Sequence, residues 1–232
     1  MALFHVVIPA AGTGSRMNSG TPKQYLPIAG KPIIQHTLGV FSDSPHIDSI
    51  VVALSPGDDF WNKLHIALHE KVSVLRCGGD SRSATVLNAL ETMAGSVSED
   101  DWILVHDAVR PGLSQATLSR LLETLEQDTV GGLLAVPLAD TLKRADDDQR
   151  VEKTEPRDHL WQAQTPQMFR YGLLKKALKE MGSSPTDEAQ AVEALGLRPK
   201  LVQGESRNIK ITYPQDLQLA EAILGMASEK RA

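Results

Sequence analysis

The stretch HVVIPAAGTGSRMNSGTPKQ, residues 5–24, joins a short apolar run to a loop that holds three glycines, an arginine and a lysine. An apolar run of this length, rich in β-branched residues, is typical of a buried strand. Gly12 and Gly14 allow the backbone of the loop to approach a ligand closely and to present N–H groups to an anion. Because Arg16 and Lys23 flank these glycines, the stretch predicts a first strand followed by a cationic, anion-binding loop.

Two standard phosphate-binding motifs are absent from the loop. The dinucleotide-binding pattern G-x-G-x-x-G requires a third glycine where this chain has Met17, so an NAD-dependent oxidoreductase is disfavoured. The Walker A pattern G-x-x-x-x-G-K-[ST] does not occur here either. A lone G-x-G loop can equally be a turn whose cations face solvent. The interpretation as a polyphosphate cradle therefore depends on the rest of the chain.

Beyond the loop, strand-like apolar runs alternate with helical patterns. Strands are predicted at 49–54, 72–77, 101–108 and 131–138, and helices at 32–42, 58–70, 82–94 and 114–127. This alternation predicts βαβ units, and runs that are apolar on both faces predict a parallel sheet covered by helices on each side. We therefore expect an α/β fold, a Rossmann-like three-layer sandwich with a mostly parallel sheet, whose ligands bind at the carboxyl ends of the strands.

The alternation breaks after Leu138, where the chain becomes polar and charged. Two short alternating stretches, DTLKR at 140–144 and RVEKTEP at 150–156, flank a turn-forming ADDDQ segment. This pattern predicts a projecting β-hairpin arm at about 138–160. The remainder completes a single domain of residues 1–232, with helices at 170–181 and 186–195, strands at 200–204 and 208–212, and a last helix from Pro214.

Composition and charge disfavour several classes of protein. The chain has 232 residues, 41% of them hydrophobic, which is ordinary for a globular domain that buries a core. Its net charge of -5 argues against binding to nucleic acid or to an anionic membrane surface, because both require a basic surface. The single cysteine, Cys77, precludes an internal disulfide. With no long apolar segment and no signal-peptide pattern, the sequence predicts a cytoplasmic protein that binds neither nucleic acid nor membrane.

Several motifs together resemble a known family. The loop PAAGTGSRM with the following PKQYL resembles nucleotidyltransferases that join a sugar or polyol phosphate to a nucleoside triphosphate. Five further blocks follow in order along the chain, namely VHDAVRP, DTLKR, EPRDHLWQAQTPQMF, TDEA and NIKIT. Over essentially the full chain they resemble the 2-C-methyl-D-erythritol 4-phosphate cytidylyltransferases, whose fold is of the nucleotide-diphospho-sugar transferase type. One block would be weak evidence, whereas five in the family's order are specific.

The resemblance implies transfer of CMP from CTP to 2-C-methyl-D-erythritol 4-phosphate, giving 4-diphosphocytidyl-2-C-methyl-D-erythritol and pyrophosphate in the non-mevalonate isoprenoid pathway. A phosphate monoester is already ionised at neutral pH, so no general base is needed to create the nucleophile. Cations and Mg²⁺ must instead stabilise the charge on the reacting phosphates. The expected partners are CTP, the methylerythritol phosphate, and Mg²⁺ or another divalent cation. The enzyme is expected to be a homodimer that exchanges its arms.

The resemblance also implies roles for individual residues. Catalysis is assigned to the phosphate-contacting cations Arg16, Lys23 and Lys210. Nucleotide contacts map onto Ala10, Ala11, Gly12, Thr13, Gly14, Gly79, Asp80, Thr85, Asp107 and Ala108, with Asp107 also a candidate ligand of Mg²⁺. Contacts to the second substrate map onto Arg110, Thr141, Arg157, Thr165 and Thr186. Of these, Thr141 and Arg157 are expected to reach into the active site of the partner subunit.

Several of these residues also have an ordinary structural explanation. Without the resemblance, Lys210 would be read as a surface lysine, Asp107 as a helix N-cap and Arg110 as one half of a surface salt bridge. Arg157 would be a solvated charge on a polar hairpin. His106, which precedes Asp107, is expected to be structural rather than catalytic.

Two other functions remain open at the level of sequence. The first is a related enzyme that uses another polyol phosphate, such as ribitol 5-phosphate. Because such an enzyme would share the CTP loop, only the arm and the segment HDAVRPGLS could distinguish the two substrates. A non-catalytic nucleotide-binding module would keep the pocket without turnover. The joint presence of Arg16, Lys23, Asp107 and Lys210 argues against such a module, because binding alone does not require cations at the reacting phosphorus.

Overall fold

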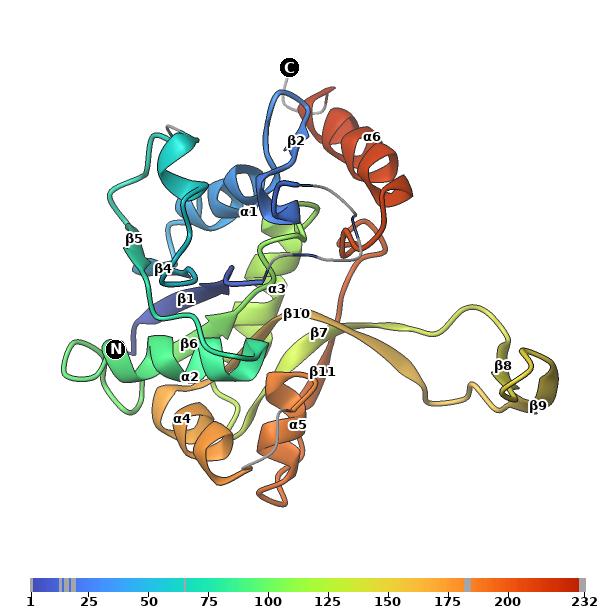
Figure 1. Cartoon of the computed structure of the whole chain (residues 1–232). Helices are drawn as coiled ribbons and strands as arrows, with labels where there is room; N and C mark the ends of the chain where they lie inside the picture. Colours follow the sequence, from blue (N-terminus) through green and yellow to red (C-terminus); the bar gives the residue numbers. More distant parts are fainter. Residues whose placement is uncertain are drawn as a thin grey trace.

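A computed structural model describes residues 2–12, 14, 17, 20–64, 66–181 and 185–229. Two predicted site residues, Thr13 and Arg16, lie outside the described residues. The chain forms a body around a central sheet, and a long β-hairpin arm projects from that body (Figure 1). Within the described residues, no helix is both long enough and apolar enough to cross a membrane.

The central sheet is mostly parallel. Its strands are β1 (Phe4–Pro9), β4 (Ser49–Ala53), β5 (Val72–Leu75), β6 (Trp102–Val105), β7 (Gly131–Pro137), β10 (Trp161–Arg170) and β11 (Lys200–Gln203). They lie in the order β11-β7-β10-β6-β1-β4-β5. β1 pairs in parallel with β4 and β6, β4 with β5, and β7 with β11, whereas β10 runs antiparallel to both β6 and β7. The predicted mostly parallel α/β sheet is confirmed.

Helices cover both faces of this sheet. They are α1 (Ile33–Ser42), α2 (Arg82–Thr92), α3 (Gln115–Leu125), α4 (Tyr171–Glu180), α5 (Glu188–Glu193) and α6 (Gln215–Glu229). Alternate residues of β1 point into two different cores, because side chains alternate across a strand. Val6 packs with residues of α1 and α3, and Val7 packs with residues of α2, α4 and α5. The result is the expected three-layer sandwich.

Side-chain caps fix where three of the helices begin. Ser81 Oγ accepts the N–H of Ala84 at 3.0 Å at the start of α2, and Ser114 Oγ accepts the N–H of Thr117 at 3.1 Å at the start of α3. Asp187 Oδ1 accepts the N–H of Gln190 at 2.9 Å at the start of α5. Such caps satisfy backbone donors that have no partner within the helix. They also fix the positions of Arg82, the first residue of α2, and of Glu188, the first residue of α5. Both residues belong to the site described below.

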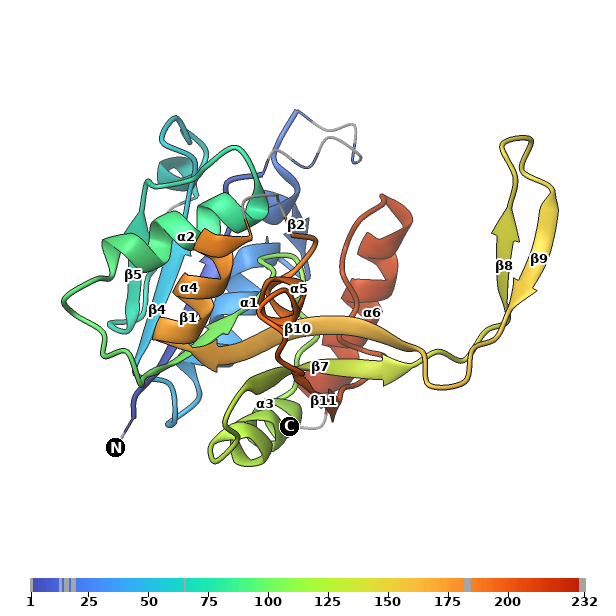
Figure 2. The ribbon, with the colours of Figure 1, turned by 90° about the horizontal axis from the view of Figure 1, so that it is seen from below.

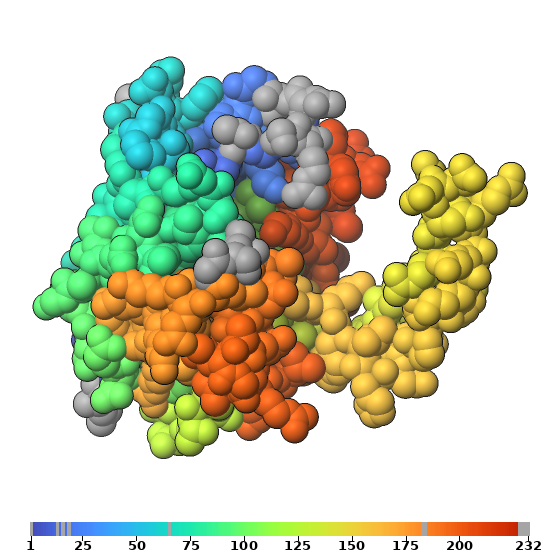
Figure 3. All heavy atoms as spheres, turned by 60° about the horizontal axis from the view of Figure 1, so that its bottom comes forward, coloured from blue at the N-terminus to red at the C-terminus, as the bar shows by residue number. Residues whose placement is uncertain are grey.

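The arm is the hairpin predicted from sequence. Its strands are β8 (Leu142–Ala145) and β9 (Val151–Glu155), which pair antiparallel and are closed by a turn in which Asp146 N–H donates to Arg150 O at 3.0 Å. The hairpin is carried away from the body on extensions of β7 and β10 (Figure 2). The space-filling view also shows it standing clear of the body (Figure 3).

The predicted helix at 58–70 is wrong. The described residues of this segment hold only the short 3₁₀ helix η3 (Trp61–Lys63). In a helix the backbone O of Asp58 would accept the N–H of Asn62, but here this oxygen accepts Arg76 Nη1 at 2.7 Å. Asp58 Oδ1 also accepts the N–H groups of Phe60 and Trp61, each at 2.9 Å, and so caps only this short turn. Its Oδ2 accepts the hydroxyl of Tyr25 at 2.5 Å, which ties the turn to η2 (Lys23–Tyr25).

Two further expectations about strands differ from the structure. The predicted strand at 208–212 is wrong, since this segment is irregular and joins the body through single contacts such as Ile211 N–H to Val109 O at 3.0 Å. Conversely, the sequence did not predict β10. Residues 161–163 at its start are exposed and the pairing register shifts between Ala163 and Gln167, so the hydrophobic pattern of a central strand is interrupted.

The remaining small elements lie beside the site. A hairpin of β2 (Pro27–Ile28) and β3 (Lys31–Pro32) follows η2, and its Ile28 is buried with Val109 and Ile211. Ala220 of α6 belongs to the same small cluster. The last helix therefore holds the segment around Ile211 against the edge of the sheet.

Candidate active site

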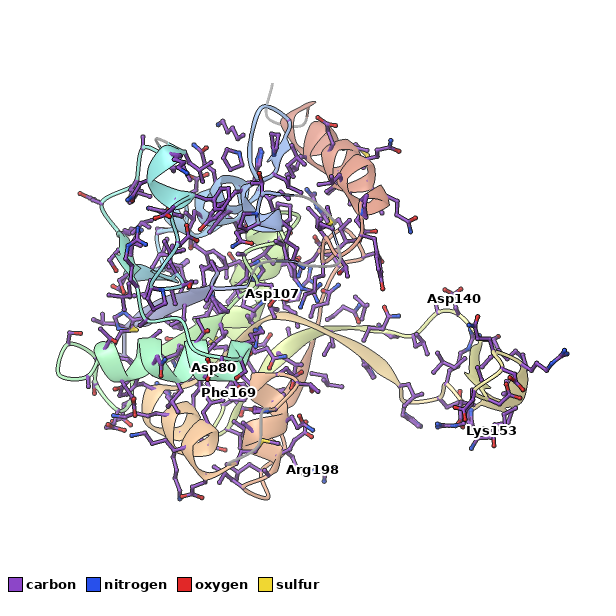
Figure 4. The ribbon with its side chains drawn as sticks, viewed as in Figure 1. Asp80, Asp107, Asp140, Lys153, Phe169 and Arg198 are labelled. Atoms are coloured by element: carbon purple, nitrogen blue, oxygen red, sulfur yellow. The ribbon has the colours of Figure 1, made fainter. Side chains whose placement is uncertain are left out.

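A pocket of about 410 Å³ opens where β1 and β6 end, at the carboxyl edge of the parallel strands. It is lined by Pro9, Ala10, Ala11, Gly12, Gly14, Lys23, Gln24, Gly79, Asp80, Ser81, Arg82, Thr85, Asp107, Ala108, Val109 and Lys210. Every predicted catalytic or nucleotide-binding residue that the structure describes is in this set. The side-chain view places Asp80 and Asp107 on the body, whereas Asp140 and Lys153 lie out toward the arm (Figure 4).

The loop after β1 is held open by Gln24. This buried side chain donates through Nε2 to Ala10 O at 2.9 Å and to Gly12 O at 3.1 Å. Gly14 has φ +70°, and a Cβ there would lie 2.7 Å from Lys23 Cγ. Both its conformation and its contact with Lys23 therefore require glycine, and the glycine brings the Lys23 side chain against the loop.

The two described catalytic candidates are linked through one segment. Lys23 Nζ donates to the backbone O of Ile211 at 3.1 Å, and the neighbouring Lys210 extends to Asp107, with its Nζ 3.0 Å from Oδ2. Both lysines line the pocket. Residues far apart in the sequence are thereby brought to one pocket.

Asp107 lies at the centre of a cluster of cations. Its Oδ1 accepts from Arg82 Nε at 3.0 Å, and its Oδ2 lies 3.3 Å from Arg110 Nε and 3.0 Å from Lys210 Nζ. Burial alone would raise the pKa of Asp107, but Arg82, Lys210 and Arg110 together outweigh burial and hold that pKa well below its usual range. Asp107 is therefore a permanent carboxylate, and its alternative interpretation as a helix N-cap is wrong, because Ser114 caps α3.

His106 is structural, as predicted. It is fully buried, and its Nε2 lies 3.1 Å from Arg110 O while its Nδ1 lies 3.0 Å from Thr165 Oγ1. Because the carbonyl of Arg110 can only accept, Nε2 carries the ring proton, and Nδ1 of the neutral ring accepts the hydroxyl hydrogen of Thr165. Thr165 Oγ1 in turn accepts the N–H of Asp107 at 3.1 Å. Burial lowers the pKa of His106 to about 4. The neutral ring holds Thr165 and Arg110 on either side of Asp107.

The residues predicted to bind the second substrate lie in three places, and none of them is among the residues that line the pocket. Arg110 and Thr165 adjoin Asp107, and Arg110 forms a buried ion pair rather than the surface salt bridge considered from sequence. Thr186 is exposed just before α5, where its N–H donates to Gln190 Oε1 at 2.7 Å. Thr141 and Arg157 belong to the exposed arm and are absent from the pocket of their own chain.

Sequence reasoning missed two charged residues of the site, Arg82 and Glu188. Arg82 Nη1 donates to Glu188 Oε1 at 2.6 Å, so the guanidinium joins Asp107 to α5. A signal for Arg82 was available, because Ser81 precedes a helical pattern and so places Arg82 in the first turn of a helix that follows a strand. Glu188 lies within the recognised TDEA block, but no spacing indicates its contact with Arg82.

The donor set limits how a divalent cation could be held. Within the described ranges, no group of three or more His, Cys, Asp or Glu side chains is placed to bind a metal. Both oxygens of Asp107 already accept from cations, and Asp80 is the other carboxylate that lines the pocket. This set does not fit a metal bound by protein ligands alone. It does fit Mg²⁺, which commonly takes one or two carboxylates together with substrate phosphates.

The pocket suits phosphate transfer by electrostatics. Backbone N–H groups of a glycine loop can contact a polyphosphate, and the two lysines supply positive charge. His106, the histidine nearest to Asp107, is held neutral by burial. The mostly parallel sheet, together with a cationic pocket at its carboxyl edge that is lined by residues of the PAAGTGSRM, VHDAVRP and NIKIT blocks, assigns the chain to the α/β nucleotidyltransferases.

Comparison with known proteins narrows this class. A family model described as 2-C-methyl-D-erythritol 4-phosphate cytidylyltransferase matches residues 4–226, and the chain belongs to this family. It is 55% identical over 97% of its length to the protein of that name from Nitrosospira multiformis, covering 98% of the relative. It is 56% identical to the protein of the same name from an Azoarcus species, covering 97% of each chain. A crystal structure of 4-diphosphocytidyl-2C-methyl-D-erythritol synthase superposes with a TM-score of 0.87 at 42% identity, covering 97% of this chain and 99% of the other.

Proposed function

We propose that the pocket binds CTP and that the chain transfers its cytidylyl group to 2-C-methyl-D-erythritol 4-phosphate in the non-mevalonate isoprenoid pathway. The products are 4-diphosphocytidyl-2-C-methyl-D-erythritol and pyrophosphate. The observation that carries the proposal is the convergence of the glycine loop, Lys23, Lys210 and Asp107 on one pocket in a member of this family.

The chemistry requires positioning and charge rather than a base. An oxygen of the substrate phosphate attacks the α-phosphorus of CTP, a new P–O bond forms, and the bond to the β-phosphate breaks to release pyrophosphate. Negative charge accumulates on the α-phosphoryl oxygens and on the leaving group. Lys23 and Lys210 line the pocket and are proposed to neutralise this charge. Arg16 is assigned the same role by the family resemblance alone.

The nucleotide base is proposed to lie between two backbone segments. Ala10, Ala11 and Gly12 line one side of the pocket, and Gly79 and Asp80 line another. The second segment is shaped by Thr85, whose Oγ1 accepts the N–H of Gly79 at 3.1 Å and donates to Ser81 O at 2.9 Å. Fixed backbone donors and acceptors read the amino and carbonyl groups of cytosine, and a narrow space excludes a purine. Gly14 and Ala108 complete the proposed nucleotide contacts, and Thr13 is assigned by resemblance only.

The second substrate is proposed to bind beside Asp107. Arg110 and Thr165 of the same chain contact Asp107, and Thr186 is assigned by the family resemblance. Thr141 and Arg157 are proposed to come from the arm of a partner subunit. Arg157 suits a phosphate group because a guanidinium donates two parallel hydrogen bonds. In its own chain, Arg157 Nη1 donates to Ala139 O at the base of the arm.

The exposure of the arm supports a homodimer. Isolated two-stranded hairpins are marginally stable in water, yet every residue from Lys143 to Thr154 is exposed. Apolar side chains are exposed along and beside it, with Val151 at 64%, Leu160 at 43% and Trp161 at 37% exposure. Docking of the arm on a second copy of the chain would cover these side chains and bring Thr141 and Arg157 to that copy's pocket.

Mg²⁺ or another divalent cation is proposed as the cofactor, with Asp107 and the CTP phosphates as its ligands. When bound, the cation would offset the charge of the triphosphate. The enzyme is further proposed to act in the cytoplasm, as predicted from sequence.

The test is pyrophosphate release from CTP with 2-C-methyl-D-erythritol 4-phosphate, in parallel with ribitol 5-phosphate. ATP, GTP and UTP replace CTP in matched reactions, and Mg²⁺ is omitted or chelated in a further set. Release only with CTP, the methylerythritol substrate and a divalent cation supports the proposal. Turnover with ribitol 5-phosphate instead would identify the chain as a ribitol 5-phosphate cytidylyltransferase. CTP binding without turnover of any substrate would favour a non-catalytic nucleotide-binding module.

A further inference from the structure

Glu188 is a buried carboxylate that joins α5 to the centre of the site. It is the first residue of α5 and is 0% exposed. Its Oε1 accepts from Arg82 Nη1 at 2.6 Å, and Arg82 Nε donates to Asp107 Oδ1 at 3.0 Å. One guanidinium is therefore held between two carboxylates that come from different elements.

The position of Glu188 is fixed by its neighbours on the chain. Asp187 caps α5 and also accepts from Gln167 Nε2 through Oδ2 at 3.0 Å. The N–H of Ala189 donates to Gln167 Oε1 at 2.8 Å, so residues on both sides of Glu188 are bonded to the same glutamine of β10. This attachment gives the Glu188 carboxylate little freedom to follow Arg82 if the guanidinium moves.

The charges of the cluster leave one cation in excess. Arg82, Arg110 and Lys210 contribute three positive charges, and Asp107 and Glu188 contribute two negative charges. Burial alone would lower the pKa of Arg82, but Glu188 and Asp107 outweigh burial and raise it. Arg82 stays charged, and its orientation depends on which carboxylates are available.

We propose that Glu188 is a positioning residue for cytidylyl transfer, which holds Arg82 so that Asp107 keeps Lys210 at the reacting phosphates. The inference rests on the proposed function of the pocket. Without the Glu188 charge, Arg82 has only Asp107 as an ionic partner within this cluster and competes with Lys210 for that carboxylate. Alternatively, Arg82 turns toward the triphosphate of CTP. CTP binding is then not weakened, because the site has lost a negative charge and a cation now faces the nucleotide. Either movement displaces groups at the reacting phosphorus, so the chemical step suffers more than CTP binding.

A purely structural role predicts a different pattern. Loss of one partner from a buried ion pair leaves the other charge uncompensated, which destabilises the fold. If Glu188 served only the fold, its replacement would lower thermal stability, while the correctly folded fraction would keep its kcat. The loss of thermal stability would itself depend on the residue at position 82, because Arg82 is the ionic partner of Glu188. The kcat of the folded fraction is therefore the quantity that separates the two roles.

The test is a double-mutant cycle with Glu188→Gln, Arg82→Gln and the double variant. Glutamine keeps the shape of Glu188 and an oxygen acceptor for Arg82 Nη1 and removes the charge, while an NH2 group replaces Oε2, which is buried without a hydrogen-bond partner. Glu188→Asp is the conservative variant. Glu91→Gln is the matched control, because this carboxylate of α2 pairs on the surface with Lys179 at 2.8 Å. For each folded variant, kcat, the KM for CTP and Tm are measured with the methylerythritol substrate.

We expect Glu188→Gln to lower kcat about tenfold, within the range of coupling between contacting residues, with the KM for CTP unchanged or lower. In the Arg82→Gln background the same substitution should change kcat less than about twofold, since its effect passes through Arg82. Glu188→Asp should recover part of the kcat, and Glu91→Gln should match the wild type. The inference would be overturned if the losses of kcat in the two single variants simply multiplied in the double variant, or if folded Glu188→Gln kept the wild-type kcat. Neither result would affect the proposed function. A wild-type protein that is inactive with CTP would overturn both.

Discussion

Lys210 Nζ lies 3.0 Å from Asp107 Oδ2, although the two residues come from segments far apart in the sequence. Lys210 follows a segment that Arg110 also holds, because Arg110 Nη1 donates to Asn208 O at 2.8 Å. Separate side-chain and backbone contacts rather than a strand ladder therefore attach residues 208–211 to the body. Asp107 gathers the cations of the site, and its charge determines where they lie.

Replacement of Asp107 by asparagine is expected to lower both activity and stability. At pH 7 the free energy of unfolding should fall by about 3 kcal/mol, because Arg82, Arg110 and Lys210 lose their shared buried carboxylate. Cations lower the pKa of Asp107 in the folded protein. Its stabilising contribution is therefore present above the unfolded pKa of about 3.9 and is lost as the pH falls below that value.

Denaturant unfolding of the wild type and Asp107→Asn at several pH values between 7 and 3 measures this contribution. The difference between the two proteins should be largest at neutral pH and should shrink below about pH 4. Asp59→Asn, at an exposed aspartate, is the control and should leave stability unchanged. A difference that stays constant down to pH 3 would contradict the assignment of a depressed pKa.

Lys23→Ala is expected to leave the fold intact and to lower turnover roughly 10²- to 10³-fold, the scale seen when one preorganised charge-stabilising group is removed. The reason is its place in the pocket beside Gly14 and Lys210. Steady-state pyrophosphate release measures the effect, and circular dichroism checks the fold. Lys176→Ala, which removes a lysine with 63% side-chain exposure on α4, is the control. Near-normal turnover of Lys23→Ala would remove Lys23 from the catalytic set.

Buried neutral His106 predicts a second pH dependence. Its folded pKa of about 4 lies below its ordinary 6.5, so the unfolded state takes up a proton first as the pH falls. The free energy of unfolding should decrease by up to about 3 kcal/mol between pH 6.5 and pH 4, and this loss should level off below pH 4.

Comparison of the wild type with His106→Gln isolates this group. The variant should be less stable at pH 7, because Thr165 and Arg110 O lose their partner, but its stability should decline less steeply toward pH 4. His46→Gln, at an exposed histidine, should follow the wild-type profile. Parallel profiles for the wild type and His106→Gln would show that this histidine does not titrate as its burial requires.

The parts of the fold that were predicted from sequence are those with a local pattern. β1 and its glycine loop, the capped helices α2 and α3, and the β8–β9 hairpin each follow from nearby residues. β10 was missed because its first residues are exposed beside the arm and its register is irregular. The helix at 58–70 failed where the backbone O of Asp58, which a helix would use, accepts the side chain of Arg76 instead. Hydrophobic periodicity cannot reveal such side-chain contacts.

The site, too, was predicted from sequence only where it has a local pattern. The glycine loop indicated an anion, but Lys210 and Asp107 were assigned only through resemblance to a family. The ion pair of Arg82 with Glu188 joins residues 106 positions apart, which no motif spacing encodes. Folding creates this part of the electrostatics, so it became visible only in the three-dimensional arrangement.

An active site shared between subunits predicts recovery of activity in mixed dimers. Arg157→Ala removes an arm cation and Lys23→Ala removes a pocket cation, so each variant alone should be nearly inactive. After subunit exchange at equal concentrations, half of the dimers should be mixed, and one of the two sites in each should combine an intact pocket with an intact arm. Turnover should therefore reach about a quarter of the wild-type value, as expected for a symmetric dimer with random exchange. Pyrophosphate release before and after exchange measures it.

The matched control mixes Lys23→Ala with Lys210→Ala. Both substitutions affect the pocket, so no site in their mixed dimers is complete in both pocket lysines, and no recovery is expected. Exchange itself is followed by mass spectrometry of one isotopically labelled chain. If mixed dimers of Arg157→Ala and Lys23→Ala form but remain inactive, the arm does not complete the partner's site. Its exposed strands would then require another role, because the pocket of its own chain contains neither Thr141 nor Arg157.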